Sequence, residues 1–428
     1  MKYTSLNIIA MISVSCYILA DTFFVSLGMG TYGLAALNFA VPVFGLIFGC
    51  GMMLGIGGAT KYTILKSQGY NIGANQVFTN TCLLVLGFAA GFFVCGLFFA
   101  DGIAALLGAD GKVFEMTRDY LRVILLFSPI FLANNIMVCF VRNDGAPRLA
   151  MGAMVSSSLV NIALDYIFIF MLDLGMFGAA LATGLANSVG LAILLFHIIH
   201  KRNGFELVKI KIRCQIAAGI FATGLPSFVT ETSISVVMIV FNVIMLGLAG
   251  NVGVAAYGVI ANIFIVVISI YNGIAQGIQP LISKYYGRKE MTVARLVLKY
   301  ALILMALISL VVYLCAFLLA NQISGVFNTE QNEVLQNLAV TGMRVYFTGC
   351  IFAGMNIILS IYFTSTENPR PAHVVSVLRG FVVILPLVFV LSHFMGVLGV
   401  WLAFPLAELA VGVAGVTFLF KNVVQKPA

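Results

Sequence analysis

The chain has 428 residues, of which 61% are hydrophobic and only 9% are charged. Soluble domains carry about 25% charged residues, so this composition excludes a water-soluble globule and indicates an integral membrane protein. The formal net charge of +8 comes from basic residues scattered among short segments, which fits membrane topology better than a nucleic-acid-binding face.

Apolar runs of about 20 residues, long enough to cross a hydrocarbon core, recur along the whole chain. In the first half they lie near 6–27, 33–57, 79–100, 121–141, 150–172 and 177–198. After a basic segment, six more lie near 216–248, 253–280, 298–320, 342–364, 373–395 and 399–420. The sequence therefore predicts an all-α integral membrane protein with twelve transmembrane helices. An amino-terminal lobe (1–200) and a carboxyl-terminal lobe (216–428) are joined by a cytoplasmic basic linker (201–215).

The distribution of Lys and Arg predicts the orientation of these spans. If the amino terminus is cytoplasmic, 19 of the 23 basic residues fall in cytoplasmic segments. The four on the other side are Lys112, Arg118, Arg122 and Arg344. Because basic residues concentrate in cytoplasmic loops, we expect both termini in the cytoplasm.

The two halves of the sequence resemble each other. Gly33-Leu-Ala-Ala-Leu matches Gly253-Val-Ala-Ala-Tyr, and Pro147-Arg matches Pro369-Arg. Such matches continue along the chain at a nearly constant offset of about 220 residues. Two copies with six spans each have the same orientation, so they should be related by a pseudo-two-fold axis along the membrane normal. A cleft between two such lobes can face one side at a time, which is the geometry of alternating access.

Five ionisable residues lie deep inside predicted spans, away from the ends, where a charge costs at least about 2.5–3.5 kcal/mol on insertion scales. They are Asp21, Asp165, Glu231, Arg379 and Glu408. Because such residues are expensive to place in a membrane, each is a candidate for function.

The amino-terminal half contains an oxygen-rich set. Asp21 lies deep in the first run, and Asp165 follows Asn161 by four residues, which places both on one helical face. Thr183 adds a hydroxyl. Two carboxylates, an amide and a hydroxyl can hold a proton or a small hard cation, so we predict a coupling site for Na⁺ or H⁺. Structural roles stay open: Asp165 as a cap or hydrogen-bond partner, Asp21 as a structural partner, Thr183 as a helix-packing hydroxyl.

The carboxyl-terminal half lacks this set and has Arg379 at the matching position. Its carboxylates are Glu231, in GLPSFVTETS, and Glu408, in FPLAELAVG. All three are candidates for substrate or proton handling, because a carboxylate that faces a cleft attracts cations. Either glutamate can also neutralise Arg379. We favour substrate or proton handling for Glu231 and a structural pair for Arg379 with Glu408.

Several motifs together resemble the multidrug and toxic compound extrusion (MATE) family over essentially the whole chain. They are Asp21 with the Phe-Val that follows it, GLAALNFAVP at 33–42, YLRV at 120–123, NDGAPR at 143–148, NIALDYIFI at 161–169, GAALAT at 178–183 and GLPS at 224–227. The resemblance implies a twelve-helix fold in two lobes and export of organic cations driven by inward Na⁺ or H⁺.

In that family the amino-terminal lobe binds the coupling cation through an Asp in span one, an Asn and an Asp in span five and a Thr in span six. Asp21, Asn161, Asp165 and Thr183 match these positions. Some branches also use a carboxylate in span seven; Glu231 lies nearby, but the correspondence stays open. Members commonly carry a longer leader, which leaves open a start upstream of Met1.

These expectations define a membrane antiporter of amphipathic organic cations. We expect no cofactor beyond the coupling Na⁺ or H⁺ and no nucleic-acid partner, with a monomer in contact with lipid in the cell membrane. A flippase for lipid-linked saccharides or another lipid is the alternative, although only Arg379 is a candidate for binding a pyrophosphate. An enzyme is not expected, because the sequence contains no Ser/His/Asp set, no paired-His motif and no carboxylate pair on a polar loop. The cysteines form no Cys-X-X-Cys pair, so neither disulfides nor a metal cage is predicted.

Overall fold

The computed structural model describes residues 2–209, 213–328 and 331–425. Within these ranges the chain is helical and has no strand, which confirms the all-α class. Met1, Lys211 and Lys426, which enter the predicted topology, lie outside the described residues.

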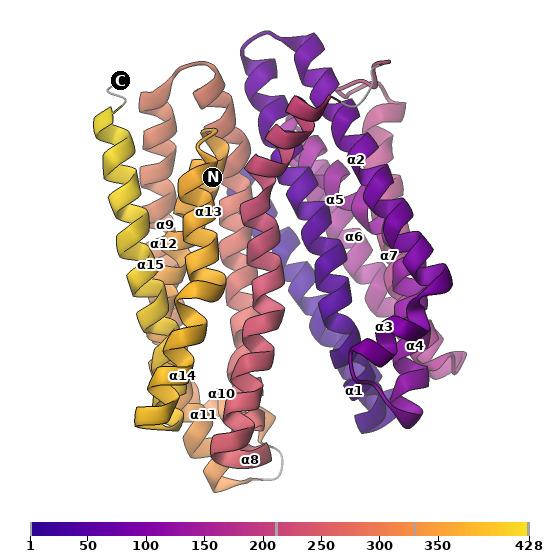
Figure 1. The fold of residues 1–428 in the computed structure, drawn as a ribbon, viewed down its shortest axis with the longest axis vertical. Coiled ribbons are helices and arrows are strands. Elements are labelled where there is room, and N and C mark those ends of the chain that lie inside the picture. The colour runs from indigo at the N-terminus through magenta and orange to yellow at the C-terminus, as the bar shows by residue number, and fades with distance from the viewer. Residues whose placement is uncertain (1, 210–212, 329–330, 426–428) are drawn as a thin grey trace. The chain divides into compact units, whose positions relative to one another are not determined.

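The first part of the chain forms a series of long helices connected by short turns (Figure 1). They are α1 (Lys2–Ser67), α2 (Asn71–Phe98), α3 (Ala100–Leu106), α4 (Gly111–Leu126), α5 (Ser128–Asn143), α6 (Pro147–Tyr166), the π-helix η1 (Ile167–Met171) and α7 (Gly175–Ile199). The second part is also a series of helices connected by short segments. It contains α8 (Cys214–Gly287), α9 (Met291–Leu318), α10 (Ala320–Phe327), α11 (Glu333–Tyr346), the 3₁₀-helix η2 (Phe347–Gly349), α12 (Cys350–Ser365), α13 (Pro369–Val377), the π-helix η3 (Leu378–Val382), α14 (Ile384–Met395) and α15 (Val397–Gln425).

Among the described residues, nine helices are long and apolar enough to cross a membrane, and the bent pair α4 and α5 makes a tenth. Two of them, α1 with 66 residues and α8 with 74, are much longer than the roughly 20 residues that a bilayer core requires. Each is interrupted at a glycine: Gly30 has φ 62° and ψ −149°, and Gly250 has φ 61° and ψ −155°. These backbone angles are open to glycine because it has no Cβ.

The predicted apolar runs fall largely within helices, although several are interrupted, for example at Phe99, Leu319 and Val383. The run at 121–141 is not one straight span, because α4 and α5 meet at an angle of 51° at Phe127. Pro129 follows this break, where the missing N–H of proline disrupts a continuous helix. The helix predicted to begin near 79 begins at Asn71, because it continues through the mixed polar and apolar segment 71–78 that precedes the apolar run.

The helices pack into two compact units. Among the described residues, unit 1 comprises 2–209, 213–232 and 283–289, and unit 2 comprises 233–282, 290–328 and 331–425. The first turns of α8, up to Thr232, therefore pack with the amino-terminal helices. The lobe boundary at 201–215 predicted from the repeat stays a prediction.

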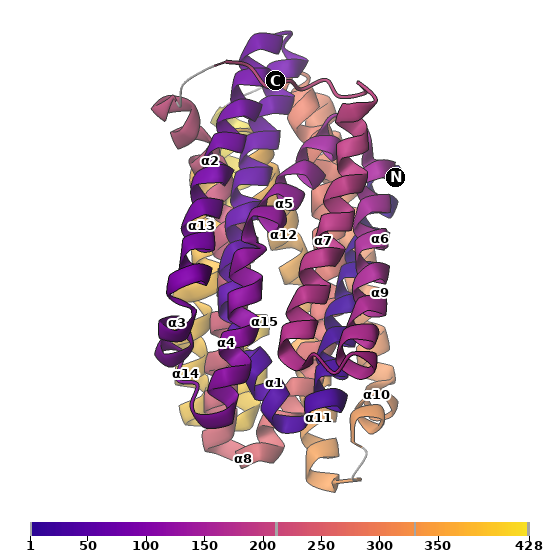
Figure 2. The same ribbon diagram turned by 90° about the vertical axis from the view of Figure 1, so that its right-hand side faces the viewer.

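Unit 1 is a bundle in which α1 contacts α2, α5 and α6, while α7 contacts α4, α5 and α6. Figures 1 and 2 both show α6 and α7 side by side. Glycines permit close backbone approach, since a Cβ at Gly57 or Gly224 would collide with the backbone of α8 or α1. Small residues at such contacts are typical of membrane helices, because no hydrophobic effect separates helix from lipid.

Unit 2 is organised around α12 and α15, which contact each other, while α9 contacts α12 and α14 contacts α15. The second part of α8 is fixed by an aromatic stack in which Tyr257 lies between Phe241 and Trp401. Trp401 is 1% exposed. The rings thereby join α8 to α15 within this unit.

Candidate functional site

The four residues predicted for cation coupling lie on three helices of unit 1 that pack against each other. Asp21 is on α1, Asn161 and Asp165 are on α6, and Thr183 is on α7, and α6 contacts both α1 and α7. All four are buried: Asp165 is 0% exposed, Asn161 2%, Thr183 4% and Asp21 9%. Helix packing therefore places the predicted oxygens in the interior of one unit.

Most of these oxygens are not satisfied by protein hydrogen bonds. Asn161 Nδ2 donates to Thr183 Oγ1 at 3.3 Å, and that hydroxyl donates to Ala179 O at 3.2 Å. Within the described part of the chain, Asp21 Oδ1, Asn161 Oδ1 and both oxygens of Asp165 are buried without a hydrogen-bond partner. Buried polar atoms in native proteins are almost always paired. A bound proton or an oxygen-ligated cation would supply the partner that these acceptor oxygens lack. The residues therefore fit a proton or a cation such as Na⁺.

The two carboxylates also affect each other and their neighbours. Asp21 and Asp165 lie close enough to repel one another when both are ionised. Two tyrosines that the sequence interpretation did not single out, Tyr17 and Tyr120, lie within electrostatic range of both acids. Tyr17 precedes Asp21 by four residues and so lies on the same helical face. This spacing could have identified Tyr17 from the sequence. Tyr120 comes from α4, and no spacing in the sequence links it to Asp21.

Local backbone features position the cluster. Asp165 lies two residues before η1, a turn of π-helix, and such turns occur often at functional sites because they redirect side chains. Gly28 of α1 faces this turn, and a Cβ there would lie 2.5 Å from Ile169 Cγ2. The absence of a side chain at Gly28 thus lets α1 approach α6 next to the acidic residues.

Unit 2 has a separate buried polar group. Arg379 Nε donates to Glu408 Oε1 at 2.5 Å, and Asn356 Nδ2 donates to Glu408 Oε2 at 2.7 Å and to its backbone carbonyl at 2.8 Å. The side chain of Glu408 is 3% exposed and that of Arg379 is 15% exposed. Arg379 lies on η3, the π-helical turn of this unit. Asn356 is the member that sequence reasoning missed.

Glu231 joins neither group. It lies half-buried on the part of α8 that belongs to unit 1, against Gly49 of α1, where a Cβ added to the glycine would lie 3.6 Å from Glu231 Cβ. Within the described ranges, no cluster of three or more His, Cys, Asp and Glu could hold a metal ion. Asp21 and Asp165 thus lie in one cluster, Glu408 lies with Arg379 in another, and Glu231 lies elsewhere on α8.

A charged centre lies at the end of α5, in the NDGAPR motif. Lys66 Nζ and the Tyr62 hydroxyl donate to Asp144 Oδ1 at 2.6 and 2.7 Å. The backbone N–H of Gly204 donates to Oδ2 at 2.6 Å, and His197 Nε2 lies 3.0 Å from the same atom. Burial raises the pKa of the Asp144 carboxyl, but these hydrogen bonds lower it more, so it lies below its usual value.

The segment predicted as a linker is fastened to this centre. Beyond Gly204, the N–H of Glu206 donates to Asn75 Oδ1 at 3.2 Å and that of Val208 to Thr79 Oγ1 at 3.0 Å. The alternation of bonded residues is that of an extended chain along α2.

Between these bonds, Phe205 is 0% exposed. Its ring packs against Tyr62, Phe78 and Phe140, with centroid distances of 4.5–6.0 Å. Residues 204–208 therefore form part of unit 1 rather than a free tether.

The ion pairs of Asp144 predict a pH-dependent stability. Because folding lowers the pKa of Asp144 below its ordinary value of about 3.9, the ionised carboxylate stabilises the fold above that pH, and the contribution is lost as the pH falls further. We expect Asp144→Asn to lower the free energy of unfolding by about 1.5–3 kcal/mol at neutral pH. Thermal unfolding of the purified protein in detergent should show a difference from wild type that narrows below about pH 4.

Asp110→Asn is the matched control, because Asp110 is exposed. It should unfold like the wild type throughout. A deficit in Asp144→Asn that stays constant down to about pH 3 would contradict this account of the carboxylate.

Comparisons with known proteins agree on one family. The MatE family model matches residues 7–167 and 226–390. The multidrug export protein MepA of Staphylococcus aureus (strain MRSA252) is 28% identical over 412 residues, which cover 94% of this chain and 89% of MepA.

Solved structures agree on the fold. An outward-facing multidrug resistance MATE family transporter of the MOP superfamily is 24% identical, covers 99% of this chain and 94% of its own, and has a TM-score of 0.93. A MOP superfamily transporter from Pyrococcus furiosus is 24% identical with a TM-score of 0.92, over 99% of this chain and 95% of its own. At these identities the structures establish the helical architecture alone.

Proposed function

The chain belongs to the MatE family of multidrug and toxic compound extrusion transporters, and from this premise we propose that it exports amphipathic organic cations in exchange for Na⁺ or H⁺. Membership confirms that the protein is a membrane transporter and not an enzyme. The substrate class is suggested by MepA, which is a multidrug export protein. The exchange is supported by one observation above all, the buried oxygens of Asp21, Asn161 and Asp165 that have no donor among the described residues.

We further propose twelve spans in two repeats. Counting α1 and α8 as two spans each, divided at Gly30 and Gly250, raises ten candidate spans to twelve. Positive φ angles recur at matching points of the two halves: Gly30 and Gly250, Gly69 and Lys289, Gly145 and Glu367, Gly175 and Gly396. The two separate segments matched by the family model support the same duplication. On this basis the proposed lobes are 1–200 and 216–428, with 201–215 between them. The distribution of Lys and Arg supports a cytoplasmic position for both termini.

The coupling site would work through differential stability of two conformations of the amino-terminal lobe. When both carboxylates are ionised, Asp21 on α1 and Asp165 on α6 repel each other. A proton or Na⁺ between them removes the repulsion and favours close packing of the two helices. A ligand shifts a conformational equilibrium only through its different affinity for the two states. Cation entry and release would therefore drive alternating access.

The carboxyl-terminal residues have different proposed roles. Arg379 and Glu408 neutralise each other and form a structural pair with Asn356. Glu231 stays a candidate for substrate or proton handling. The flippase alternative gains no support from the relatives. Arg379, its single candidate for binding a pyrophosphate, is already engaged by Glu408.

The proposed exchange can be tested by ethidium efflux from proteoliposomes, with Na⁺ and pH gradients imposed separately. We expect efflux well above that of protein-free vesicles with one of the two gradients. Dependence on Na⁺ alone assigns the site to sodium, and dependence on pH alone assigns it to protons. Efflux that ignores both gradients would contradict exchange.

A further inference from the structure

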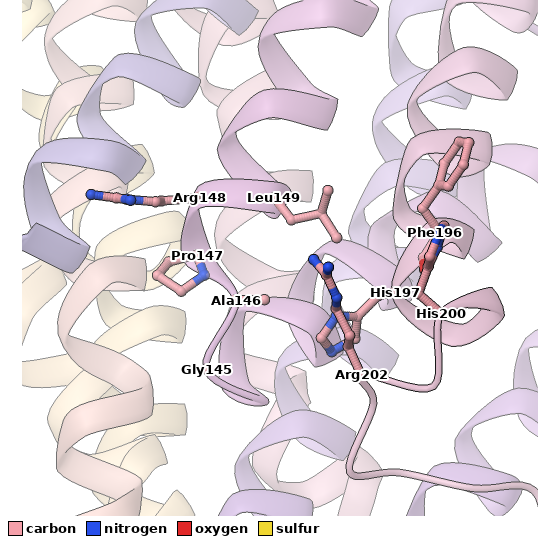
Figure 3. Close-up of a pocket in the computed structure, with 9 residues that line it drawn as sticks. All are labelled: Gly145, Ala146, Pro147, Arg148, Leu149, Phe196, His197, His200 and Arg202. Carbon is pink, nitrogen blue, oxygen red and sulfur yellow. The ribbon is translucent and has the colours of Figure 1, made fainter.

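A basic pocket lies at one end of α6 and α7 in unit 1, outside the cluster proposed for coupling (Figure 3). It has a volume of about 490 Å³ and lies between the turn that precedes α6 and the end of α7. Its lining residues are Gly145, Ala146, Pro147, Arg148, Leu149, Phe196, His197, His200 and Arg202. Arg202 and His200 are exposed, whereas His197 is buried.

The end of α7 places Arg202 at the pocket. The N–H of Arg202 donates to His197 O at 3.0 Å, and the N–H of Lys201 donates to Ile198 O at 2.9 Å. With Lys201 at φ 52°, this is a Schellman motif, which reverses the chain after the last helical turn. The reversal brings the Arg202 guanidinium back toward Leu149 and the α7 side chains in Figure 3.

The positive charge of the pocket is not cancelled from within. Arg202 has no ion-pair partner in the part of the chain that the structure describes. The nearby acid, Asp144, is already bound by Lys66 and His197. His200 Nδ1 lies 3.0 Å from Phe196 O, and its Nε2 has no partner among the described residues. The amino terminus of α6 carries a partial positive charge and the carboxyl terminus of α7 a partial negative charge, so the two helix dipoles oppose each other. The side chains therefore determine the sign of the electrostatic potential in the pocket.

An apolar track leads along α7 to this pocket. Six exposed residues, spaced so that they share one helical face, form it: Leu185, Val189, Ala192, Leu195, Phe196 and Ile199. The exposed fraction is 54% for Phe196 and 68% for Ile199, the two nearest the pocket. A ligand that has both an anionic group and long apolar chains therefore matches the pocket and the track together.

We propose that this pocket binds the phosphate of an anionic phospholipid. Arg202 is the charged contact, His200 Nε2 is a hydrogen-bonding partner, and the acyl chains lie along the track on α7. Basic pockets between transmembrane helices recognise lipid headgroups in this way. The assignment of this lipid to the cytoplasmic leaflet depends on the orientation proposed above. The proposed binding does not depend on it. A free phosphate offers the same charge without using the track.

The test uses purified full-length protein in nanodiscs of phosphatidylcholine with increasing phosphatidylglycerol, and measures occupancy with a fluorescent phosphatidylglycerol. Arg202→Gln should weaken phosphatidylglycerol binding about five-fold, since one basic residue near a membrane contributes about 1 kcal/mol. Arg148→Gln is the matched control: Arg148 also lines the pocket, but its guanidinium extends away from the other side chains in Figure 3. It should leave the affinity within two-fold of wild type.

Three results would overturn the proposal. One is an equal loss in both variants, and another is no preference for phosphatidylglycerol over phosphatidylcholine. The third is displacement of the lipid by inorganic phosphate at equal concentration, which would make this a site for a soluble anion. Both variants carry the intact coupling cluster, so ethidium efflux measured after the same purified proteins are reconstituted into proteoliposomes separates failure here from failure of the proposed transport.

Discussion

Asp165→Asn is expected to reduce gradient-driven ethidium efflux to the rate of protein-free vesicles while the protein still folds. The substitution is nearly isosteric and removes a buried charge that has no hydrogen-bond partner in the described structure. It also removes the repulsion with Asp21. Without a second ionisable carboxylate, loading and unloading of the cation no longer changes the balance between conformations. Initial efflux rates in proteoliposomes measure the effect, and thermal unfolding checks the fold.

Asp173→Asn is the matched control, because Asp173 is exposed at the end of the same predicted span and its φ of 50° is tolerated by Asn. It should transport normally. A wild-type rate in Asp165→Asn would remove this carboxylate from the coupling site. Thr183→Val then separates the two cations. A proton needs only the carboxylates, whereas Na⁺ also needs neutral oxygens, so this variant should lose efflux only if sodium is coupled.

Arg379→Ala is expected to destabilise the protein by about 3–5 kcal/mol, because it leaves the Glu408 carboxylate buried without its counter-charge. Asn356 alone cannot neutralise that charge. The double variant Arg379→Met with Glu408→Gln should recover most of the loss, since Met fills the space and Gln keeps an acceptor for Asn356. Thermal unfolding of the wild type, Arg379→Met, Glu408→Gln and the double variant gives the interaction between the two residues.

Transport by the double variant decides the role of the pair. If the pair is structural, efflux should return together with stability. Recovered stability with lost efflux would instead place Arg379 and Glu408 in substrate or proton handling. Arg344→Met is the control and should change little, because Arg344 is an exposed basic residue of the same unit whose guanidinium lies over the Phe317 ring.

The sequence was most informative where one physical rule dominated. Hydrocarbon thickness fixes the length of apolar runs, so the all-α membrane class was predicted correctly, and the break at Gly30 fell in the predicted gap between 27 and 33. Asp21, Asn161, Asp165 and Thr183 could be singled out because polar groups are costly in a membrane. The structure places them on three adjacent helices. Their role in coupling stays a prediction.

Features that depend on contacts between segments distant in the chain could not be predicted from the sequence. Tyr120 and Asn356 reach their acidic neighbours only through helix packing. The docking of residues 204–208 depends on Asn75, Thr79 and Asp144, whose distances in sequence carry no pattern. The π-helical turns at Ile167 and Leu378 were likewise not predicted from the sequence.

The most direct test of the exchange runs it in reverse. Proteoliposomes are given an ethidium gradient and no ion gradient, and the entry or exit of ²²Na⁺ and of protons is recorded in the same vesicles. Because coupling between two ligands is reciprocal, the account predicts that ethidium moving in one direction drives one of these cations in the other, and that Asp165→Asn abolishes the cation flux. Ethidium movement catalysed by the wild-type protein with neither cation moving in the opposite direction would contradict it.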